Sequence, residues 1–317
     1  MISVVITTFN EENNLPRAVA SVKGLADEIV VVDTESTDDT VEIAKKLGCR
    51  VFTHKYPGIV EPVRNFSIGK AKGDWILVLD ADEEVSESLK KHILETVASP
   101  KGDYYRIPRK NMIFDKWIES THWWPDYVYR LFRKGYVVWD EAIHSVPSTR
   151  GQGADFPPTM EYALIHHHYD TISQYVSRLN RYTDHQLKLL LDQNTRFSWD
   201  LLISKPSQEF LTQYFARHGY SDGVHGLALS LLQAFSELVL YLKLWQYTGF
   251  PKSQPVPEQV NVELAEQGRQ LGWWYYQSRI ESSSGLTRPF WKLVRKVRTL
   301  RLFPYKEYKS ISKFFGR

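Results

Sequence analysis

The segment from residue 75 to residue 84, WILVLDADEE, restricts the fold of this chain more than any other part of the sequence. Its apolar half has the length of a fully buried parallel strand, and its carboxylates follow directly where that strand ends. Open α/β sheets bind ligands at the carboxyl ends of their strands. Asp80 and Asp82 are two residues apart, so they share one side of an extended backbone. The segment predicts a strand that carries two acidic side chains to a binding edge.

Two roles are open for these acidic residues. A hard divalent cation, Mg²⁺ or Mn²⁺, binds one or two carboxylates together with phosphate oxygens of a substrate, and would relieve the repulsion between Asp80 and Asp82. The alternative is stabilisation of a helix, because a helical pattern follows and acidic side chains favour the first turn of a helix. We expect Glu83, Glu84 and Glu87 to serve only the second role.

Strand-like and helical patterns alternate along the N-terminal part of the chain. Apolar runs occupy residues 2–7, 28–33 and 50–52, and helical patterns begin at Asn14 and cover residues 41–47 and 61–72. This alternation predicts βαβ units and an α/β fold with a mainly parallel sheet flanked by helices. Right-handed crossovers then bring the ends of the first, second and fourth strands into one cleft. The sequence contains neither a G-x-G-x-x-G motif nor a P-loop lysine motif.

The predicted cleft collects polar side chains from these strand ends: Thr7, Asn10, Asp33, Arg64, Asp80 and Asp82. The carboxylate of Asp33 can accept hydrogen bonds from a nucleotide base or ribose, or it can cap the turn that follows the strand. Arg64 can neutralise a diphosphate through two parallel hydrogen bonds, or it can form a surface ion pair with Glu61. The sequence leaves both alternatives open.

Four motifs in this order resemble the family-2 glycosyltransferases, which have the GT-A fold. They are residues 3–12 (SVVITTFNEE), residues 29–38 (IVVVDTESTD), Arg64-Asn65 and Asp80-Ala81-Asp82. The resemblance implies a GT-A, Rossmann-like mixed sheet followed here by a C-terminal α-helical region. It also implies the roles of single residues: Thr7, Asn10, Glu11 and Asp33 in the nucleotide pocket, Arg64 at the diphosphate, Asp80 and Ala81 at the ribose, and Asp82 as ligand of Mg²⁺ or Mn²⁺.

Residues 103–170 change in character, because aromatic side chains alternate with polar ones in short strand-like runs. Trp117, Trp123 and Trp124 gather just before Pro125. Their rings can stack on the faces of sugars, or they can pack over an edge of the sheet. The sequence does not separate these two roles.

The segment that begins at Asp126 resembles the region in which the family keeps its catalytic base. Pro125 stands here in place of the first acid of that motif. An inverting transfer needs one carboxylate to take the proton from the attacking hydroxyl group. We expect Asp126 to be that base, with Glu141 as the second candidate. The alternative for Asp126 is a salt bridge to Arg130 or Arg133.

Histidines form a second group of candidates. The segment from Glu141 to His144 resembles the acceptor-side part of the family, some members of which add a histidine to the metal, so His144 is a candidate ligand. His166 and His168 belong to a strand-like run, in which alternation points them the same way. For each of these imidazoles, the alternative to a metal ligand is an ordinary structural hydrogen bond.

From Thr171 onward the pattern is helical. Residues 224–246 are strongly apolar, but Glu237 and Lys243 interrupt them, which favours burial or a shallow interfacial position over a bilayer span. The GT-A-like core is followed by residues 117–144 and by a helical tail that contains Asp222-Gly223 and His225-Gly226. This arrangement, over residues 1–247, is most similar to the lipopolysaccharide-core β-glucosyltransferase branch of the family. This similarity implies a nucleoside-diphosphate sugar as donor, UDP favoured, and a lipid-linked or cell-envelope glycan as acceptor.

The C-terminal segment is basic. Residues 288–317 hold ten Lys and Arg against the single acid Glu307. Apolar side chains of residues 290–300 form a stripe opposite the basic ones, which is typical of a helix on an anionic membrane. Nucleic-acid binding is the less favoured alternative, and packing of the stripe on the protein itself is the structural one.

We therefore predict a metal-dependent inverting glycosyltransferase in three parts, a catalytic domain at 1–170, a helical region at 171–247, and a linker with basic tail at 248–317. The lone Cys49 and the strand-like start indicate a cytoplasmic protein, peripheral on the inner face of the membrane. The alternatives are a sugar nucleotidyltransferase, which typically carries a glycine- and lysine-rich loop after its first strand, and a non-catalytic scaffold that binds membrane or nucleic acid.

Overall fold

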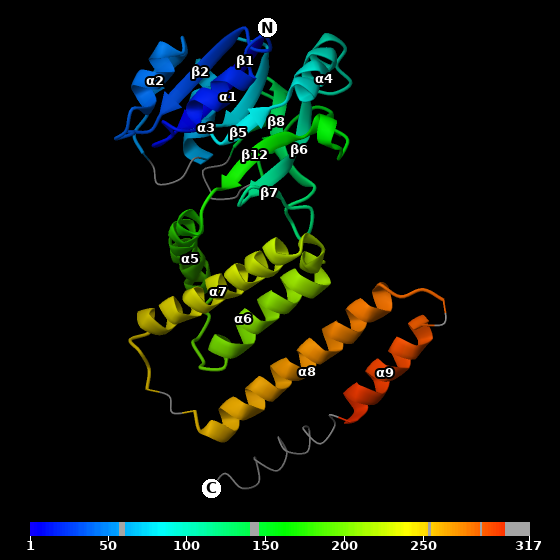
Figure 1. Ribbon diagram of the computed structural model, residues 1–317. Helices are drawn as coiled ribbons and strands as arrows, with labels where there is room; N and C mark the ends of the chain where they lie inside the picture. The colour runs from blue at the N-terminus through cyan, green and yellow to red at the C-terminus, as the bar shows by residue number, and fades with distance from the viewer. Residues whose placement is uncertain (57–60, 140–145, 253–254, 286, 302–317) are drawn as a thin grey trace. The chain divides into compact units, whose positions relative to one another are not determined.

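The computed structural model describes residues 1–56, 61–139, 146–252, 255–285 and 287–301 (Figure 1). The chain divides into two compact units, Met1–Asp170 and Thr171–Arg317. The strands that the structure assigns all lie in the first unit, and the described part of the second unit is helical.

Four parallel strands form the N-terminal half of the sheet in the order β3-β2-β1-β4. Their bounds are β1 Ile2–Thr8, β2 Glu28–Asp33, β3 Arg50–Thr53 and β4 Trp75–Asp80. The helices between them are α1 (Leu15–Ser21), α2 (Thr40–Lys46) and α3 (Glu61–Lys70). The predicted alternation of strands and helices is confirmed, and α3 ends two residues before the predicted end.

The rest of the sheet is mixed and continues from β4 in the order β8-β6-β12-β5. β8 is antiparallel to both β4 and β6, β12 is parallel to β6, and β5 is antiparallel to β12. The bounds are β5 Glu83–Val85, β6 Tyr104–Ile113, β7 Lys116–Trp117, β8 Asp126–Arg133, β9 Val137–Val138, β10 Ser148–Thr149, β11 Gly153–Asp155 and β12 Leu164–Tyr169, with the short helix η1 at Met160–Tyr162. The predicted fold class, a mixed GT-A-like sheet with flanking helices and a C-terminal helical region, is confirmed.

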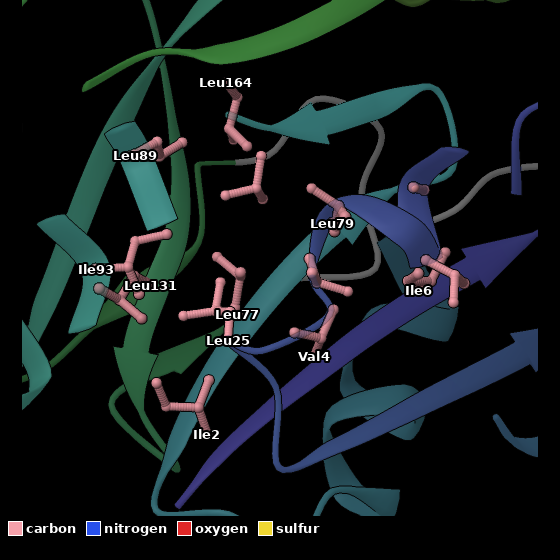
Figure 2. Packing of buried hydrophobic residues seen from close by; sticks show 14 of the residues in the cluster. Ile2, Val4, Ile6, Leu25, Leu77, Leu79, Leu89, Ile93, Leu131 and Leu164 are labelled. Atoms are coloured by element: carbon pink, nitrogen blue, oxygen red, sulfur yellow. The ribbon is translucent and has the colours of Figure 1, made fainter. Parts of the chain in front are cut away.

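Both faces of the sheet are covered, which explains why the central strands are apolar throughout. On one face, Val4, Ile6, Leu77 and Leu79 belong to one buried cluster with side chains from α1 and α2. Leu89 and Ile93 of α4 (Glu87–Ala98) join the same cluster (Figure 2). On the other face, alternate residues of the same strands pack against α3. This packing on both faces fixes the positions of the strand ends and of the loops that follow them.

The acidic segment after β4 differs from the prediction. Ser86 caps α4, because its hydroxyl oxygen accepts a hydrogen bond from the backbone N–H of Leu89 at 3.2 Å. Glu83 and Glu84, expected only in the first turn of a helix, lie instead on the short strand β5. Glu83 is fully buried there. The prediction for these two residues was wrong, because pairing of β5 with β12 determines their position.

The second unit contains α5 (Ile172–Asp192), α6 (Leu201–Leu211), the π-helical turn η2 (Thr212–Ala216), η3 (Gly219–Asp222), α7 (Val224–Tyr247), α8 (Pro257–Glu281) and α9 (Thr287–Arg301). Thr171 and Gln174 form a capping box at the start of α5. Pro206 lies inside α6, and the π turn follows directly after Leu211.

Candidate active site

Two loops meet at the carboxyl ends of β1 and β2. Thr8 pairs with Asp33 in the strand register, and its hydroxyl donates to Asp33 Oδ1 at 3.1 Å. The backbone N–H of Ser36 donates to Asp33 Oδ2 at 3.0 Å. Asp33 is buried and holds the turn after β2, which is the structural role that the sequence left open. Its contact with a nucleotide stays a prediction.

Asn10 joins the two loops. Its backbone has a positive φ of 55°, a conformation that asparagine tolerates better than most residues. Asn10 Oδ1 accepts hydrogen bonds from the backbone N–H of Thr37 at 2.8 Å and from its hydroxyl at 3.3 Å. The N–H of Glu11 donates to Thr40 Oγ1 at 2.8 Å. The predicted nucleotide-pocket residues Asn10, Glu11 and Asp33 therefore lie in one cross-linked pair of loops.

Asp80 lies at the end of β4, directly opposite Thr7 of β1. Arg64 of α3 donates to both carboxylate oxygens of Asp80, at 3.0 and 3.3 Å, and Arg130 donates to Oδ2. Burial alone would raise the pKa of Asp80, but the guanidinium groups of Arg130, Arg64 and Arg109 outweigh it and hold that pKa well below its usual range. Asp80 is therefore an anion at neutral pH.

A β-bulge aims Arg130 at this carboxylate. Opposite β6, the register passes from Tyr129 to Leu131, so Arg130 is the extra residue on β8. Arg130 is 3% exposed, and its guanidinium donates to Glu83 Oε1 at 2.7 Å as well as to Asp80. Burial alone would lower the pKa of Arg130, but the carboxylates of Asp80 and Glu83 outweigh burial and raise that pKa above its ordinary value. Arg130 is thus a permanent buried cation between two acids.

Asp82 follows in the turn between β4 and β5, and β12 lies beside it. The N–H of His167 donates to the Asp82 carbonyl at 2.9 Å, and His166 Nε2 is 3.5 Å from Asp82 Oδ2. His168 Nδ1 lies 3.2 Å from His166 Nε2, whereas His167 contacts Glu84 at 3.2 Å. The predicted alternation of His166 and His168 is confirmed.

The described residues contain no group of three or more His, Cys, Asp and Glu side chains placed to hold a metal ion. A ligand set completed by the protein alone is therefore not seen in that part of the chain. A hard cation that takes one carboxylate and the oxygens of a substrate needs no such group. Glu141 and His144, the second candidate base and the second candidate ligand, lie outside the described residues.

Asp126 begins β8 and faces Arg109 in the register of β6. Its Oδ2 accepts hydrogen bonds from Arg109 Nε at 2.9 Å and from Asn111 Nδ2 at 3.1 Å, and Arg109 Nη2 is 2.6 Å from the same oxygen. The expected structural partners, Arg130 and Arg133, bind Asp80 and Asp103 instead. Asp126 therefore forms a salt bridge, but the predicted partners were wrong. The pairing of β8 with β6 places Arg109 beside Asp126.

The predicted tryptophans pack against one another. Trp117 and Trp124 meet edge to face with ring centroids 5.1 Å apart, and Lys110 Nζ lies 5.3 Å from the centroid of Trp117. Trp123 is buried and contacts His168 with centroids 5.0 Å apart. These contacts are the packing role that the sequence left open, and stacking on a sugar stays a prediction.

Sequence reasoning missed four polar residues of this region: Glu83, Arg109, Asn111 and, as partner of Asp80, Arg130. One signal was available. Arg109 and Asn111 share one face of β6 with Ile107 and Ile113. A strand that serves packing alone would carry apolar side chains at all four of these positions.

Comparisons with known proteins identify related sequences. Residues 3–149 match the model of glycosyl transferase family 2. An uncharacterized glycosyltransferase of Rickettsia typhi is 34% identical over 253 residues, covering 77% of this chain and 86% of its own length. One from Rickettsia conorii is 31% identical over 260 residues and covers 77% of this chain and 89% of its own length.

Solved structures overlap with part of the chain. TarS of S. aureus, in complex with UDP-GlcNAc, is 20% identical with a TM-score of 0.33 and covers 43% of this chain and 46% of that one. Glucosyl-3-phosphoglycerate synthase of Mycobacterium tuberculosis, in complex with Mn²⁺, UDP and glucosyl-3-phosphoglycerate, is 25% identical with a TM-score of 0.30. The match covers 33% of this chain and 43% of that one.

Proposed function

Since the chain belongs to glycosyl transferase family 2 and is a glycosyltransferase enzyme, we propose that it is an inverting enzyme that uses a UDP-sugar. Its acceptor in this proposal is a hydroxyl group of a lipid-linked or lipopolysaccharide-type cell-envelope glycan. One observation carries the proposal: a single network of charged side chains joins Asp80, at the end of the parallel strands, to Asp126 on the antiparallel side, through Arg130, Glu83 and Arg109. In this proposal, the donor half and the acceptor half of the transfer site belong to one sheet.

The donor half lies at the parallel strand ends. The cross-linked loops with Asn10, Glu11 and Asp33 receive the base, and Thr7, Asp80 and Ala81 border the ribose. Arg64 is only partly buried, with 13% of its side chain exposed, and its guanidinium can turn its remaining N–H groups to the diphosphate. The loops are fixed before the nucleotide arrives, which lowers the entropic cost of binding.

Asp82 would hold Mg²⁺ or Mn²⁺ together with oxygens of the donor diphosphate. The fit rests on the chemistry of the residues present, because this class of hard ion takes one or two protein carboxylates and fills its remaining positions with substrate and water oxygens. His166, 3.5 Å from Asp82, is placed to support it. When bound, the ion offsets negative charge on the leaving diphosphate.

Asp126 takes the proton of the acceptor hydroxyl as the oxygen attacks the anomeric carbon. The new bond forms between that oxygen and the anomeric carbon, the bond from that carbon to the diphosphate oxygen breaks, and the nucleoside diphosphate leaves with its electron pair. The proton ends on the Asp126 carboxylate. Arg109 and Asn111 hold Oδ2, so that the carboxylate is oriented before the acceptor binds.

Turnover of nucleotide sugars tests this function. Purified protein with Mn²⁺ is assayed for release of nucleoside diphosphate from a panel of UDP- and GDP-sugars, with a bacterial envelope glycolipid extract as acceptor. We expect Asp126→Asn to lower the rate about 100-fold or more, because a general base contributes factors of that order. Asp155→Asn, in an exposed ion pair with Arg106, is the control. Equal rates for Asp126→Asn and wild type would exclude Asp126 as the base.

The acceptor proposal includes a membrane surface on the cytoplasmic side. The described helix α9 carries basic residues and no acidic ones. It packs on α8 through Trp291 and Arg295, with Arg295 over the ring of Trp273 at 5.1 Å. Phe290, Leu293 and Val297 remain 57%, 61% and 42% exposed. The apolar stripe is thus available to a bilayer whose anionic lipids attract the basic residues.

Flotation with vesicles tests this surface. Wild type should float with vesicles that contain phosphatidylglycerol and less with pure phosphatidylcholine, and Phe290→Ser with Leu293→Ser should reduce flotation. Leu264→Ser, an exposed apolar residue of α8, is the control. Equal flotation of all forms would remove the proposal.

Among the described residues, α7 is long and apolar enough to cross a bilayer, and 28% of its most apolar window is buried.

A further inference from the structure

Asn111 lies in the middle of the site and makes three polar contacts while fully buried. Its strand, β6, runs between β8 and β12, so a side chain at this position reaches both neighbours. Nδ2 donates to the carbonyl oxygen of Trp123 at 2.8 Å and to Asp126 Oδ2 at 3.1 Å. Oδ1 lies 2.6 Å from Nδ1 of His166, its register partner on β12.

The partners of Asn111 determine which way its amide points. A backbone carbonyl can only accept a hydrogen bond, so the amide nitrogen must face Trp123. The amide oxygen therefore faces His166, and His166 Nδ1 must carry the hydrogen. The other ring nitrogen, Nε2, faces Asp82 Oδ2 at 3.5 Å and His168 Nδ1 at 3.2 Å.

The cost of such a residue in the core points to a role beyond packing. Ile107 and Ile113 lie on the same face of β6 and are fully buried, so an apolar side chain at position 111 would suit the strand. Asn111 is kept in place by three partners, two of which, Asp126 and His166, belong to opposite sides of the proposed site.

We propose that Asn111 is a positioning residue that sets both sides of the transfer site with one amide. Its N–H group orients the carboxylate of Asp126, and its oxygen accepts a hydrogen bond from His166 Nδ1–H, so that Nε2 is the ring nitrogen that faces Asp82. The proposal rests on the proposed function, in which Asp126 is the base and Asp82 binds the metal. Hydrogen-bonded neighbours of this kind commonly change metal affinity or activity 10- to 100-fold.

Two substitutions separate the two sides of the amide. Asn111→Asp keeps an acceptor for His166 and replaces the donor to Asp126 with a second carboxylate beside it, whereas Asn111→Leu removes both contacts at similar volume. In ¹⁵N-histidine-labelled protein, long-range ¹H–¹⁵N spectra report the tautomer of His166, identified by loss of its signals in His166→Gln. We expect the Nδ1–H tautomer in wild type and Asn111→Asp, and the Nε2–H tautomer, which is favoured in water, in Asn111→Leu.

Turnover supplies the second measurement. We expect both variants to lower kcat for the active nucleotide sugar about 10- to 100-fold with little change in donor KM. Asn261→Leu, at an exposed position of α8, is the matched control and should leave kcat unchanged. An Nε2–H tautomer in wild type would overturn the proposal, and so would a wild-type kcat in both Asn111 variants.

The tautomer measurement needs no activity, so failure of the proposed function is seen separately. If Asp126→Asn has the full wild-type rate, the assignment of the base is wrong and the positioning role at Asp126 falls with it. If wild type has the Nδ1–H tautomer and Asp126→Asn is inactive, the two Asn111 variants alone decide the positioning role.

Discussion

Replacement of Arg130 by methionine would remove the cation that two buried carboxylates share. Arg130 is 3% exposed, Glu83 is fully buried, and Asp80 is the second partner. Loss of one partner of a buried ion pair leaves an uncompensated charge in a region of low polarity, which costs about 3 to 5 kcal/mol. Methionine fills a similar volume and adapts to irregular space, so the lost charge and not a cavity dominates the effect.

The structure places the expected loss near the lower end of that range. Asp80 keeps Arg64 at 3.0 Å. Glu83 keeps the backbone N–H of Asp80 at 3.0 Å, and Arg109 Nη1 at 3.6 Å. We therefore expect a decrease of about 3 kcal/mol in the free energy of unfolding, which corresponds to a Tm lower by about 6 to 12 °C for a unit of this size.

Thermal unfolding at neutral pH measures this effect, with Arg133→Met on the same strand as control. The Arg133 side chain is 45% exposed and 3.6 Å from Asp103, so its loss should cost less than about 1 kcal/mol. The double variant Arg130→Met with Glu83→Gln should recover most of the loss, because glutamine still accepts from the N–H of Asp80. A Tm for Arg130→Met as high as that of the control would refute the reasoning.

The pH dependence has a definite sign. Arg130 and Arg64 hold the pKa of Asp80 in the folded protein below its value in the unfolded chain. The stability that this carboxylate contributes is therefore present above the unfolded pKa and lost as the pH falls through the folded pKa. The difference in Tm between wild type and Arg130→Met should therefore be large at neutral pH and shrink under strongly acidic conditions.

Three further predictions concern stability and reactivity. Burial raises the pKa of the Cys49 thiol from 9.0 to about 11, so native protein should react with iodoacetamide near neutral pH about 100-fold more slowly than unfolded protein, and stability should fall once the pH passes the unfolded pKa. Gly226→Ala should destabilise the protein by more than about 2 kcal/mol, because its Cβ would lie 1.7 Å from the carbonyl oxygen of Gly219. Gly268→Ala, with nothing within 4 Å of its Cβ, should raise the Tm, since alanine is favoured by up to about 1 kcal/mol in a helix.

Features encoded within a short segment were predictable from the sequence. The apolar run Trp75–Leu79 is buried throughout because helices cover both faces of its sheet, and its carboxylates follow at the predicted edge. The same-side placement of His166 and His168 follows from the period of a strand. The order of strands and helices was readable because each apolar run ends in polar turn residues.

Features that depend on strand pairing were not predictable. An acidic run before a helix fits the first helical turn equally well, and only pairing with β12 places Glu83 in the core. Asp126 meets Arg109 because β8 pairs with β6 in one register, and the bulge at Arg130 turns that guanidinium to Asp80. Asn111 joins His166 because β12 lies parallel beside β6, a long-range contact that no local pattern encodes.

Binding of a nucleotide sugar tests the central claim most directly. Purified protein is titrated with UDP- and GDP-sugars in the presence of Mn²⁺, and binding is followed by calorimetry and by the shift in Tm. We expect one UDP-sugar to bind, with affinity that a chelator and Asp82→Ala abolish, while Asp155→Asn binds as wild type does. Absence of binding by every nucleotide sugar, or binding that Asp82→Ala leaves unchanged, would contradict a donor site at the carboxyl ends of these strands.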